Sequence, residues 1–510
     1  MLKELNSLTW GINTSKESIR KEDEFADIVN MYYNRRGALE TRRGTTNFGD
    51  SVGSKPFTSL FFFQNDETGA RYLVGTSGTN MYKYVEWTNS WSSIKSGLTE
   101  FEADGVTRTK WSFAVYKNII YMCDGVNNYA KWDGTTYTEY AGTPKFRYIQ
   151  YMGDRVFGAW VDATPNTLYY TSAAAAEANN PANVVVVGGD ELWRINSIKE
   201  LGSFICAGKT GKIYSINVSA PSSTPINSRS GIQSHRSVQN VEGSLLFFNE
   251  FWLDTLKQVS AISGTQALGT AILSENIREL FANIQPENYK TNCSLYAPLL
   301  NNYYFSFDAN NVGTTDTTVV WSSSFGAFTK YSIPTLNDYC TYIDSDWEYL
   351  YLLAPNTGWQ VLEFERWYND NWVGIEWLCD YRTKFGTDDW KTISWVQIRG
   401  RKSIQKEATL DIYMDWEVVS TCQITDDFIE VNASPYPVGN SPIGNLSIGW
   451  GANMSDNIDT YEFSLRIPVE VTGQELGIRI SSSETPLVFS LEQMRVEVNK
   501  EVISLFDNYA

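Results

Sequence analysis

The feature that most constrains this chain is a repeated pattern of short apolar segments separated by polar turns. Leu60–Phe63, Asn118–Cys123 and Arg155–Trp160 are typical segments. Groups of such segments recur roughly every 40–55 residues, which is the period of four-stranded propeller blades. Helical repeats would instead show an apolar period of about 3.6 residues. The sequence therefore predicts an all-β protein with a β-propeller of five to seven blades at residues 51–373.

Turn residues support the same prediction. Asp124-Gly125 and Asp133-Gly134 each lie between apolar segments, and Asp-Gly pairs favour tight hairpin turns. Helical pattern is scarce. The best candidate is Ser274 to Ile284, where Ile277, Leu280, Phe281 and Ile284 fall on one face and Ser274 is placed to cap the helix.

The pattern changes after about Gly374. Residues 374–510 contain at least five alternating segments and a loop rich in Gly, Pro, Ser and Asn at Ser434 to Ile458. Such an arrangement predicts a β-sandwich domain. Residues 1–50 are expected to be an extended N-terminal segment that reaches a neighbouring subunit.

Composition supports strands and restricts the function. The chain has 18 Trp, 30 Tyr and 25 Phe, and aromatic side chains favour half-buried sheets. Its formal net charge is −18, with 21 acidic against 11 basic residues in 374–510. Tight sequence-specific binding to nucleic acid depends on Lys and Arg and is therefore not expected. An acidic wall that repels phosphate would instead let DNA slide past without sticking.

The six cysteines, Cys123, Cys206, Cys293, Cys340, Cys379 and Cys422, are too widely spaced for a zinc or redox motif. Single buried thiols suit a reducing compartment. The N-terminus lacks a basic stretch followed by an apolar one, so no signal peptide is expected. No apolar run approaches the roughly 20 residues of a membrane span.

A segment near the N-terminus resembles the signature of short-tailed phage tail nozzle proteins of the tail tubular protein B type. That pattern combines an Asn, a Gly-x-Leu and an x-Arg-x-Gly followed by Thr or Ile. Here it falls on Asn30, Gly37, Leu39, Arg42 or Arg43, Gly44 and Thr45, with Arg43 in place of the usual Pro. Further segments that look like the same family are Tyr169–Ser172, Val185–Gly189, Gly211–Tyr214, Gly326–Lys330, Tyr381–Phe385, Trp395–Arg399 and Leu410–Asp415.

The resemblance implies a virion structural protein that forms a hexameric ring below the portal and adaptor rings and contacts other tail proteins. Such a nozzle retains genomic DNA and conducts it during ejection, without sequence-specific binding. The expected location is the virion tail, assembled in the cytoplasm of a bacterial host.

Four arginines, Arg35, Arg36, Arg42 and Arg43, flank a predicted turn at Gly37. Arginine forks bind carboxylates in a bidentate manner, so these residues are candidates for contacts with a partner ring or a neighbouring subunit. A solvated hairpin rim is the alternative interpretation, and a DNA contact is a weaker one.

No catalytic centre is predicted. His235 is the one histidine, and a triad or a histidine-based metal site would have to use it alone, so a structural role is expected. Glycoside-cleaving carboxylate pairs are not recognisable, and no cofactor or metal site is expected. Trp87, Trp91, Trp132 and Trp160 could form a sugar-binding surface, but closing each blade as core is the preferred interpretation.

Three functions therefore remain open. The leading one is the tail nozzle or hub subunit. The alternatives are a carbohydrate-binding propeller for host receptor recognition and, third, a glycan-cleaving propeller enzyme.

Overall fold

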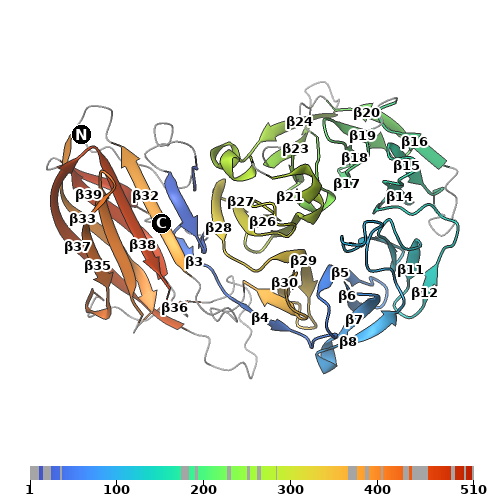
Figure 1. Ribbon diagram of the computed structural model, residues 1–510, viewed down its shortest axis with the longest axis horizontal. Coiled ribbons are helices and arrows are strands. Elements are labelled where there is room, and N and C mark those ends of the chain that lie inside the picture. The colour runs from blue at the N-terminus through green and yellow to red at the C-terminus, as the bar shows by residue number, and fades with distance from the viewer. Residues whose placement is uncertain are drawn as a thin grey trace. The chain divides into compact units, whose positions relative to one another are not determined.

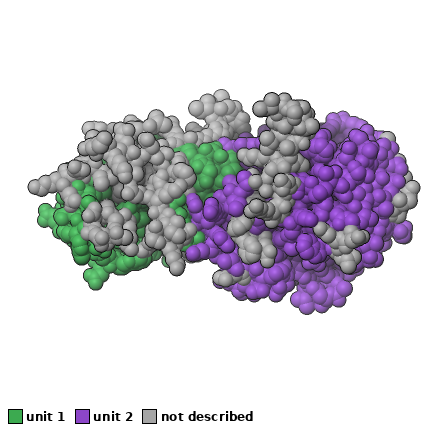
Figure 2. Space-filling view, turned by 90° about the horizontal axis from the view of Figure 1, so that it is seen from above, with its two compact units in different colours: residues 1–46, 318–333, 364–510 green, residues 47–317, 334–363 purple. Residues whose placement is uncertain are grey.

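The computed structural model describes the chain except for residues 1–10, 15–23, 35–36, 174–182, 190–192, 227–230, 250–252, 261–265, 283, 366–375, 385–389, 404–405, 429–435, 439–457, 484–488, 499–500 and 508–510. The described chain forms two compact units (Figure 2). Unit 1 comprises residues 1–46, 318–333 and 364–510, and unit 2 comprises residues 47–317 and 334–363.

Unit 2 is a β-propeller, visible as the ring of sheets in Figure 1. Six four-stranded antiparallel sheets form blades among the described residues. In chain order, the first five blades are β5–β8 (Phe57–Gln64, Arg71–Ser77, Asn80–Val85, Ser90–Lys95), β9–β12 (Ser112–Tyr116, Ile119–Cys123, Ala130–Trp132, Tyr137–Glu139), β13–β16 (Tyr148–Met152, Arg155–Ala159, Thr167–Tyr170, Asn183–Val186), β17–β20 (Ser197–Leu201, Phe204–Gly208, Ile213–Asn217, Ser222–Pro225) and β21–β24 (Gln239–Val241, Ser244–Phe248, Leu253–Ser260, Gln266–Ile272).

The last two positions of the ring are built differently. Strands β25 (Cys293–Ala297) and β26 (Asn302–Phe307) follow blade 5, and β25 lies between the innermost strands β21 and β29. Blade 7 consists of β29 (Leu336–Ile343), β30 (Tyr349–Pro355), β31 (Val361–Phe364) and β4 (Thr45–Phe48). The ring thus has seven innermost strands, at the upper end of the predicted five to seven.

The blades pack through aromatic and aliphatic cores between neighbouring sheets. Phe48 of β4 packs with Phe57, Tyr342 and Val361, so the core between blades 7 and 1 includes a strand from the beginning of the chain. Because β4 precedes blade 1 in the sequence, this packing ties the two ends of the propeller segment together.

Unit 1 is a β-sandwich. One sheet contains β28 (Ala327–Tyr331), β1 (Phe25–Val29), β32 (Trp377–Lys384), β38 (Glu475–Ser482), β34 (Ala408–Met414) and β35 (Glu417–Ile424), with β27 (Thr317–Ser322) beside β28. The other contains β2 (Met31–Tyr33), β3 (Leu39–Thr41), β39 (Phe489–Val498), β33 (Lys391–Ser403), β37 (Ile458–Gly473) and β36 (Tyr436–Val438), and β40 (Glu501–Asp507) pairs with β39.

Side chains of the two sheets meet in the sandwich core. The Trp377 ring of one sheet stacks on Phe489 of the other, with centroids 4.7 Å apart. Along β34 every second residue is buried, as expected for a strand with one face on a core.

The division into units differs from the predicted boundaries at residues 50 and 374. Residues 25–41, which fall in the predicted extended N-terminal segment, form β1 to β3, and these strands pair with strands of unit 1. The physical reason is that β1 hydrogen-bonds along β32, and β3 along β39, so their backbone groups are satisfied within the sandwich.

The predicted helix at Ser274 to Ile284 is a 3-10 helix at Glu275–Phe281, with Ile277 and Phe281 buried. The Ser274 hydroxyl does not cap it; its oxygen accepts a hydrogen bond from the backbone N–H of Leu253 at 2.7 Å. Much of the Ser434 to Ile458 loop lies outside the described residues.

Candidate functional site

The innermost strands of the propeller all begin at one end of the ring, which we call the N-end; the opposite end is the C-end. The residues just before or at the start of these strands are polar, and they meet near the ring axis. Contacts between the starts of neighbouring strands include Trp111 N–H to Ser59 Oγ at 2.8 Å and Ile149 N–H to Ser112 Oγ at 3.1 Å. These contacts define the candidate site.

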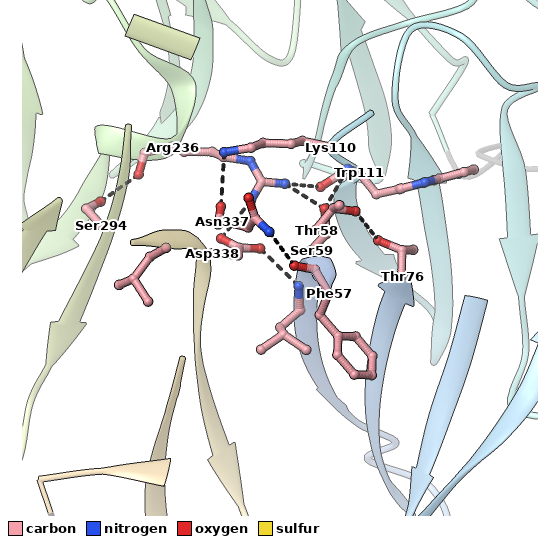
Figure 3. Close-up of polar contacts among 12 residues, drawn as sticks. Phe57, Thr58, Ser59, Thr76, Lys110, Trp111, Arg236, Ser294, Asn337 and Asp338 are labelled. Carbon is pink, nitrogen blue, oxygen red and sulfur yellow. Dashed lines mark hydrogen bonds and ion pairs between the residues drawn. The ribbon is translucent and has the colours of Figure 1, made fainter. Parts of the chain in front are cut away.

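Arg236 extends across the N-end of the ring. It lies in a short 3-10 helix, His235–Ser237, immediately before β21 of blade 5. Its guanidinium forms an ion pair with Asp338 of blade 7 at 2.7 Å. It also donates to Ser59 Oγ of blade 1 at 2.9 Å and to the carbonyl of Trp111, before blade 2, at 2.8 Å (Figure 3). One side chain thus ties four blades together.

Lys110 extends across the same end from blade 2. Its ammonium donates to the carbonyl oxygens of Thr291 at 3.2 Å and Asn337 at 3.0 Å. Burial and, next, the nearby positive charge of Arg236 lower the pKa of Lys110 to about 8. We call Lys110, Arg236, Asn337, Asp338 and Ser59 the N-end junction.

The acidic and amide members of the junction are held by the backbone. Asp338 Oδ2 accepts the N–H of Leu60 at 2.9 Å, and Asn337 Nδ2 donates to the carbonyl of Phe57 at 2.8 Å (Figure 3). The junction therefore combines two cations with one carboxylate in a network of fixed geometry. Such a network can lock blades together or attract a negative charge, but it contains no nucleophile paired with a base.

His235, beside Arg236, has a structural environment. Its ring stacks on Tyr148 with centroids 4.3 Å apart, and Nδ1 lies 3.3 Å from Ser197 Oγ. Burial and then the charges of Lys199 and Arg236 lower the pKa of His235 well below its usual value, so the ring is neutral at physiological pH. The contacts of this ring in the described chain do not include a carboxylate that would orient a catalytic histidine.

The structure describes two of the four candidate arginines near the N-terminus, Arg42 and Arg43, and both belong to unit 1. Arg35 and Arg36 lie outside the described residues. Arg42 is buried in unit 1, where Nε donates to Asn30 Oδ1 at 2.9 Å. Its other nitrogens donate to the carbonyls of Arg43 at 2.9 Å and Ser332 at 3.2 Å. Its donors are therefore used inside the sandwich rather than presented to a partner.

Asn30 explains why Arg42 is held there. Asn30 has a positive φ of 57°, which Asn tolerates better than most residues. Its amide donates to the carbonyl of Glu376 at 2.7 Å, and its side-chain oxygen also accepts the N–H of Ser332 at 2.8 Å. Gly37 takes the positive φ of 79° required in the β2–β3 turn. Arg43 donates to the carbonyl of Glu365 at 3.5 Å.

The other candidates can now be placed. Asp124 and Asp133 accept backbone N–H groups two and three residues ahead, so their predicted role in turns is confirmed. Trp132 is 1% exposed and belongs to a blade core, and Trp91 packs on Phe57 with centroids 4.6 Å apart. Trp87 is 88% exposed, so for this residue the core interpretation is wrong.

The cysteines and metal candidates add no site. Each cysteine is a free thiol, and all but Cys422 are buried. Burial raises the pKa of Cys206 and Cys293 to about 12, which leaves these thiols protonated and unreactive. Within the described ranges, no group of three or more His, Cys, Asp or Glu side chains is arranged to hold a metal ion. Among the same residues no helix is long and apolar enough to cross a membrane.

Sequence reasoning missed the N-end junction. A cation or amide lies within three residues of the start of several innermost strands, as in Lys110-Trp111, Arg147-Tyr148, His235-Arg236 and Asn337-Asp338. That recurrence was the available signal.

The sequence matches no family model and no curated protein. Several solved structures match this chain. One is "YCF48 bound to D1 peptide", with 9% identity, a TM-score of 0.37, and coverage of 64% of this chain and 97% of that one. Another is the Pan2 WD40 domain of Neurospora crassa, with 8% identity, a TM-score of 0.37, and coverage of 64% and 95%. A third is the computationally designed Ika8 protein, with 10% identity, a TM-score of 0.32, and coverage of 62% and 99%.

Proposed function

We propose that this chain is a structural subunit of a bacteriophage tail, a nozzle or hub protein that assembles with copies of itself into a ring below the portal and adaptor. Its role is mechanical rather than enzymatic: it retains genomic DNA and conducts it during ejection. Its proposed location is the virion tail, after assembly in the cytoplasm of the bacterial host.

The observation that carries this proposal is the physical role of the residues that resemble tail nozzle proteins. Asn30 supplies a left-handed backbone position, Gly37 a positive-φ turn and Arg42 a buried guanidinium. Because Asn30 and Arg42 share a buried hydrogen-bond network and Gly37 forms the neighbouring turn, a structural role for the residues of this pattern supports the proposal.

Net charge supports the same proposal. With a formal charge of −18, the surface repels phosphate overall, and DNA could pass without being trapped. The proposal therefore predicts no sequence-specific DNA binding, and only weak binding that disappears as salt increases.

The test is the assembly state and the position of the protein in particles. Purified protein is examined by analytical ultracentrifugation and negative-stain electron microscopy, and particles from an infected host are labelled with an antibody against the chain. We expect closed rings and a label on the tail. Protein that stays monomeric, together with tails that carry no label, overturns the proposal.

A second candidate function, carbohydrate binding, is favoured by two exposed indoles at the C-end of the propeller. Trp87 is 88% exposed and Trp347 is 63% exposed. Their loops are joined because Glu86 Oε1 accepts the backbone N–H of Ser345 at 2.8 Å. Strong binding by the monomer on a glycan array, lost in Trp87→Ala, favours this function. Sugar release from host polysaccharide in an activity screen would favour glycan cleavage instead.

A further inference from the structure

A tryptophan at the C-end of the propeller is held in an unusual backbone conformation. Trp347 lies at the tip of the β29–β30 hairpin, in the tripeptide Asp346-Trp347-Glu348, and its φ is +65°. This left-handed region disfavours bulky side chains and is usually occupied by Gly, Asn or Asp. The Trp347 side chain is nevertheless 63% exposed, so burial in a core does not account for the strain.

Neighbouring groups fix this tryptophan in place. The guanidinium carbon of Arg71 lies 3.9 Å from the indole centroid, and Arg71 also donates to the carbonyl of Asp344. Asp344 Oδ1 accepts the N–H groups of Asp346 at 3.0 Å and Glu348 at 2.8 Å. The hairpin therefore presents a rigid, acidic tip with an indole at its centre.

The same arrangement occurs a second time, in unit 1. The β34–β35 hairpin has Asp415-Trp416-Glu417 at its tip, with φ of +48° at Asp415 and +73° at Trp416. Trp416 is 59% exposed, and the Arg382 guanidinium carbon lies 4.4 Å from its centroid. Strain maintained at an exposed position is a feature of recognition sites, and its recurrence argues against an accident of one hairpin.

The N-end of the propeller carries a surface of complementary chemistry. The guanidinium carbon of Arg194 lies 4.3 Å from the centroid of Trp160, and that of Arg147 lies 4.8 Å from it. Arg147 is neutralised by an ion pair with Glu102 at 2.9 Å. Arg194 is exposed and forms no ion pair with another described residue. Beside it, Trp193 is 54% exposed and its ring packs against Gly211.

We propose that the acidic tip at Trp347 binds the surface formed by Arg194, Trp193 and Trp160 on a second copy of this chain. The charges are opposite, and Trp and Arg are the side chains most often found at the centres of protein interfaces. This inference rests on the proposed function, because it supplies the contact through which copies would join.

The topology explains why the contact is between copies. The tip follows β29 and so lies at the C-end, whereas Arg194 precedes β17 and Trp160 follows β14, which places them at the N-end. Two surfaces at opposite ends of one propeller cannot meet within that propeller. A contact between different surfaces of identical copies is heterologous, and it produces a ring when the rotation closes.

Charge reversal tests the contact directly on the full-length chain. Arg194→Glu and Asp346→Arg each place like charges against each other, and sedimentation velocity over a concentration series measures the dissociation constant. We expect each single variant to weaken self-association at least tenfold. The double variant Arg194→Glu/Asp346→Arg restores opposite charges and is expected to return to within about threefold of wild type.

Trp347→Gly separates recognition from folding. Glycine adopts the left-handed conformation without strain, so the thermal midpoint should not fall, whereas self-association should weaken at least tenfold. Trp416→Gly is the matched control, because it relieves the same strain in the same tripeptide and is expected to leave association unchanged.

Each result has a clear meaning. A wild-type chain that remains monomeric at all concentrations, single variants that associate normally, or a double variant that is not rescued overturns the inference. Rings that form without this contact leave the tail proposal intact while the inference fails. If copies associate through this contact but tails carry no antibody label, the inference stands and the tail proposal fails.

Discussion

Replacing Arg236 with methionine removes a side chain that joins four blades at the N-end of the propeller. Methionine keeps an unbranched apolar stem of similar reach but cannot donate to Asp338, Ser59 Oγ or the Trp111 carbonyl. Asp338 then loses the guanidinium with which it forms an ion pair, while it still accepts the Leu60 N–H at 2.9 Å. The change therefore leaves a carboxylate that is largely shielded from water without its partner.

The magnitude follows from burial. Removing one partner of a fully buried ion pair costs about 3–5 kcal/mol. Here the two side chains are 15% and 13% exposed, so water partly solvates the carboxylate that remains. We therefore expect Arg236→Met to lower the free energy of unfolding by about 2–4 kcal/mol.

A double-mutant cycle with Asp338→Asn isolates the ion pair. Asparagine keeps an oxygen for the Leu60 N–H and removes the charge. The double variant no longer contains the unpaired carboxylate. Adding Asp338→Asn to Arg236→Met should therefore lower the free energy of unfolding by little, or raise it. We expect a coupling energy of about 1–3 kcal/mol between the two positions.

The assay combines urea denaturation with hydrogen exchange measured on peptides. Arg236→Met should speed exchange in the starts of β5, β9 and β29, which belong to blades 1, 2 and 7. Arg155→Met is a suitable control, since Arg155 donates at 3.0 Å to Thr171 and lies over Tyr170 within its own blade. A loss below about 0.5 kcal/mol, or exchange that changes only near residue 236, refutes the reasoning.

Three further predictions concern single positions. The pKa of Lys110 is about 8 in the folded protein and about 10.4 in an unfolded chain, so the unfolded state binds more protons between these pH values. The free energy of unfolding of wild type, relative to that of Lys110→Met, should therefore rise by roughly 2–3 kcal/mol from pH 8 to pH 10.5. Urea denaturation measures this difference. Asn30→Ala removes the acceptor of Arg42 in a buried network and should lower unfolding free energy by about 2–4 kcal/mol, with faster hydrogen exchange confined to unit 1. Gly231→Ala would place a methyl 1.9 Å from the carbonyl oxygen of Lys209 and should cost about 1–3 kcal/mol, read from the thermal midpoint.

The strands of the propeller could be predicted because their signals are local. Phe204–Ala207 lies within β18, and the Asp133-Gly134 pair forms the turn between β11 and β12. Alternation and turn chemistry act over a few residues, so a single sequence contains them. The number of blades was less certain, because the outer strands vary in length and no fixed motif marks each blade.

The destination of the N-terminal segment could not be predicted in this way. Phe25–Val29 reads as a short apolar stretch, and nothing nearby indicates that it pairs with residues more than 300 positions later. Arg42 illustrates the consequence. In the sequence it belongs to an exposed-looking basic cluster, but the turn at Gly37 and the left-handed Asn30 fold it into the sandwich.

The N-end junction was missed for the same physical reason. Lys110 and Arg236 are 126 positions apart, and they come together only because the ring brings blades 2 and 5 to a common axis. Each cation alone is indistinguishable from a surface residue in a polar turn. Only closure of the ring gives it carbonyl and carboxylate partners.

The N-terminal pattern and the proposed recognition surface therefore need not coincide in this protein. Asn30, Gly37 and Arg42 carry the resemblance to tail nozzle proteins, yet the structure uses them to build the sandwich. A partner cannot contact a buried guanidinium, so the residues that determine what this chain binds must be exposed. Trp347 and Arg194 are both exposed and meet that requirement. It follows that charge reversal at exposed positions tests what this chain binds, whereas substitution of the buried pattern residues would test only folding.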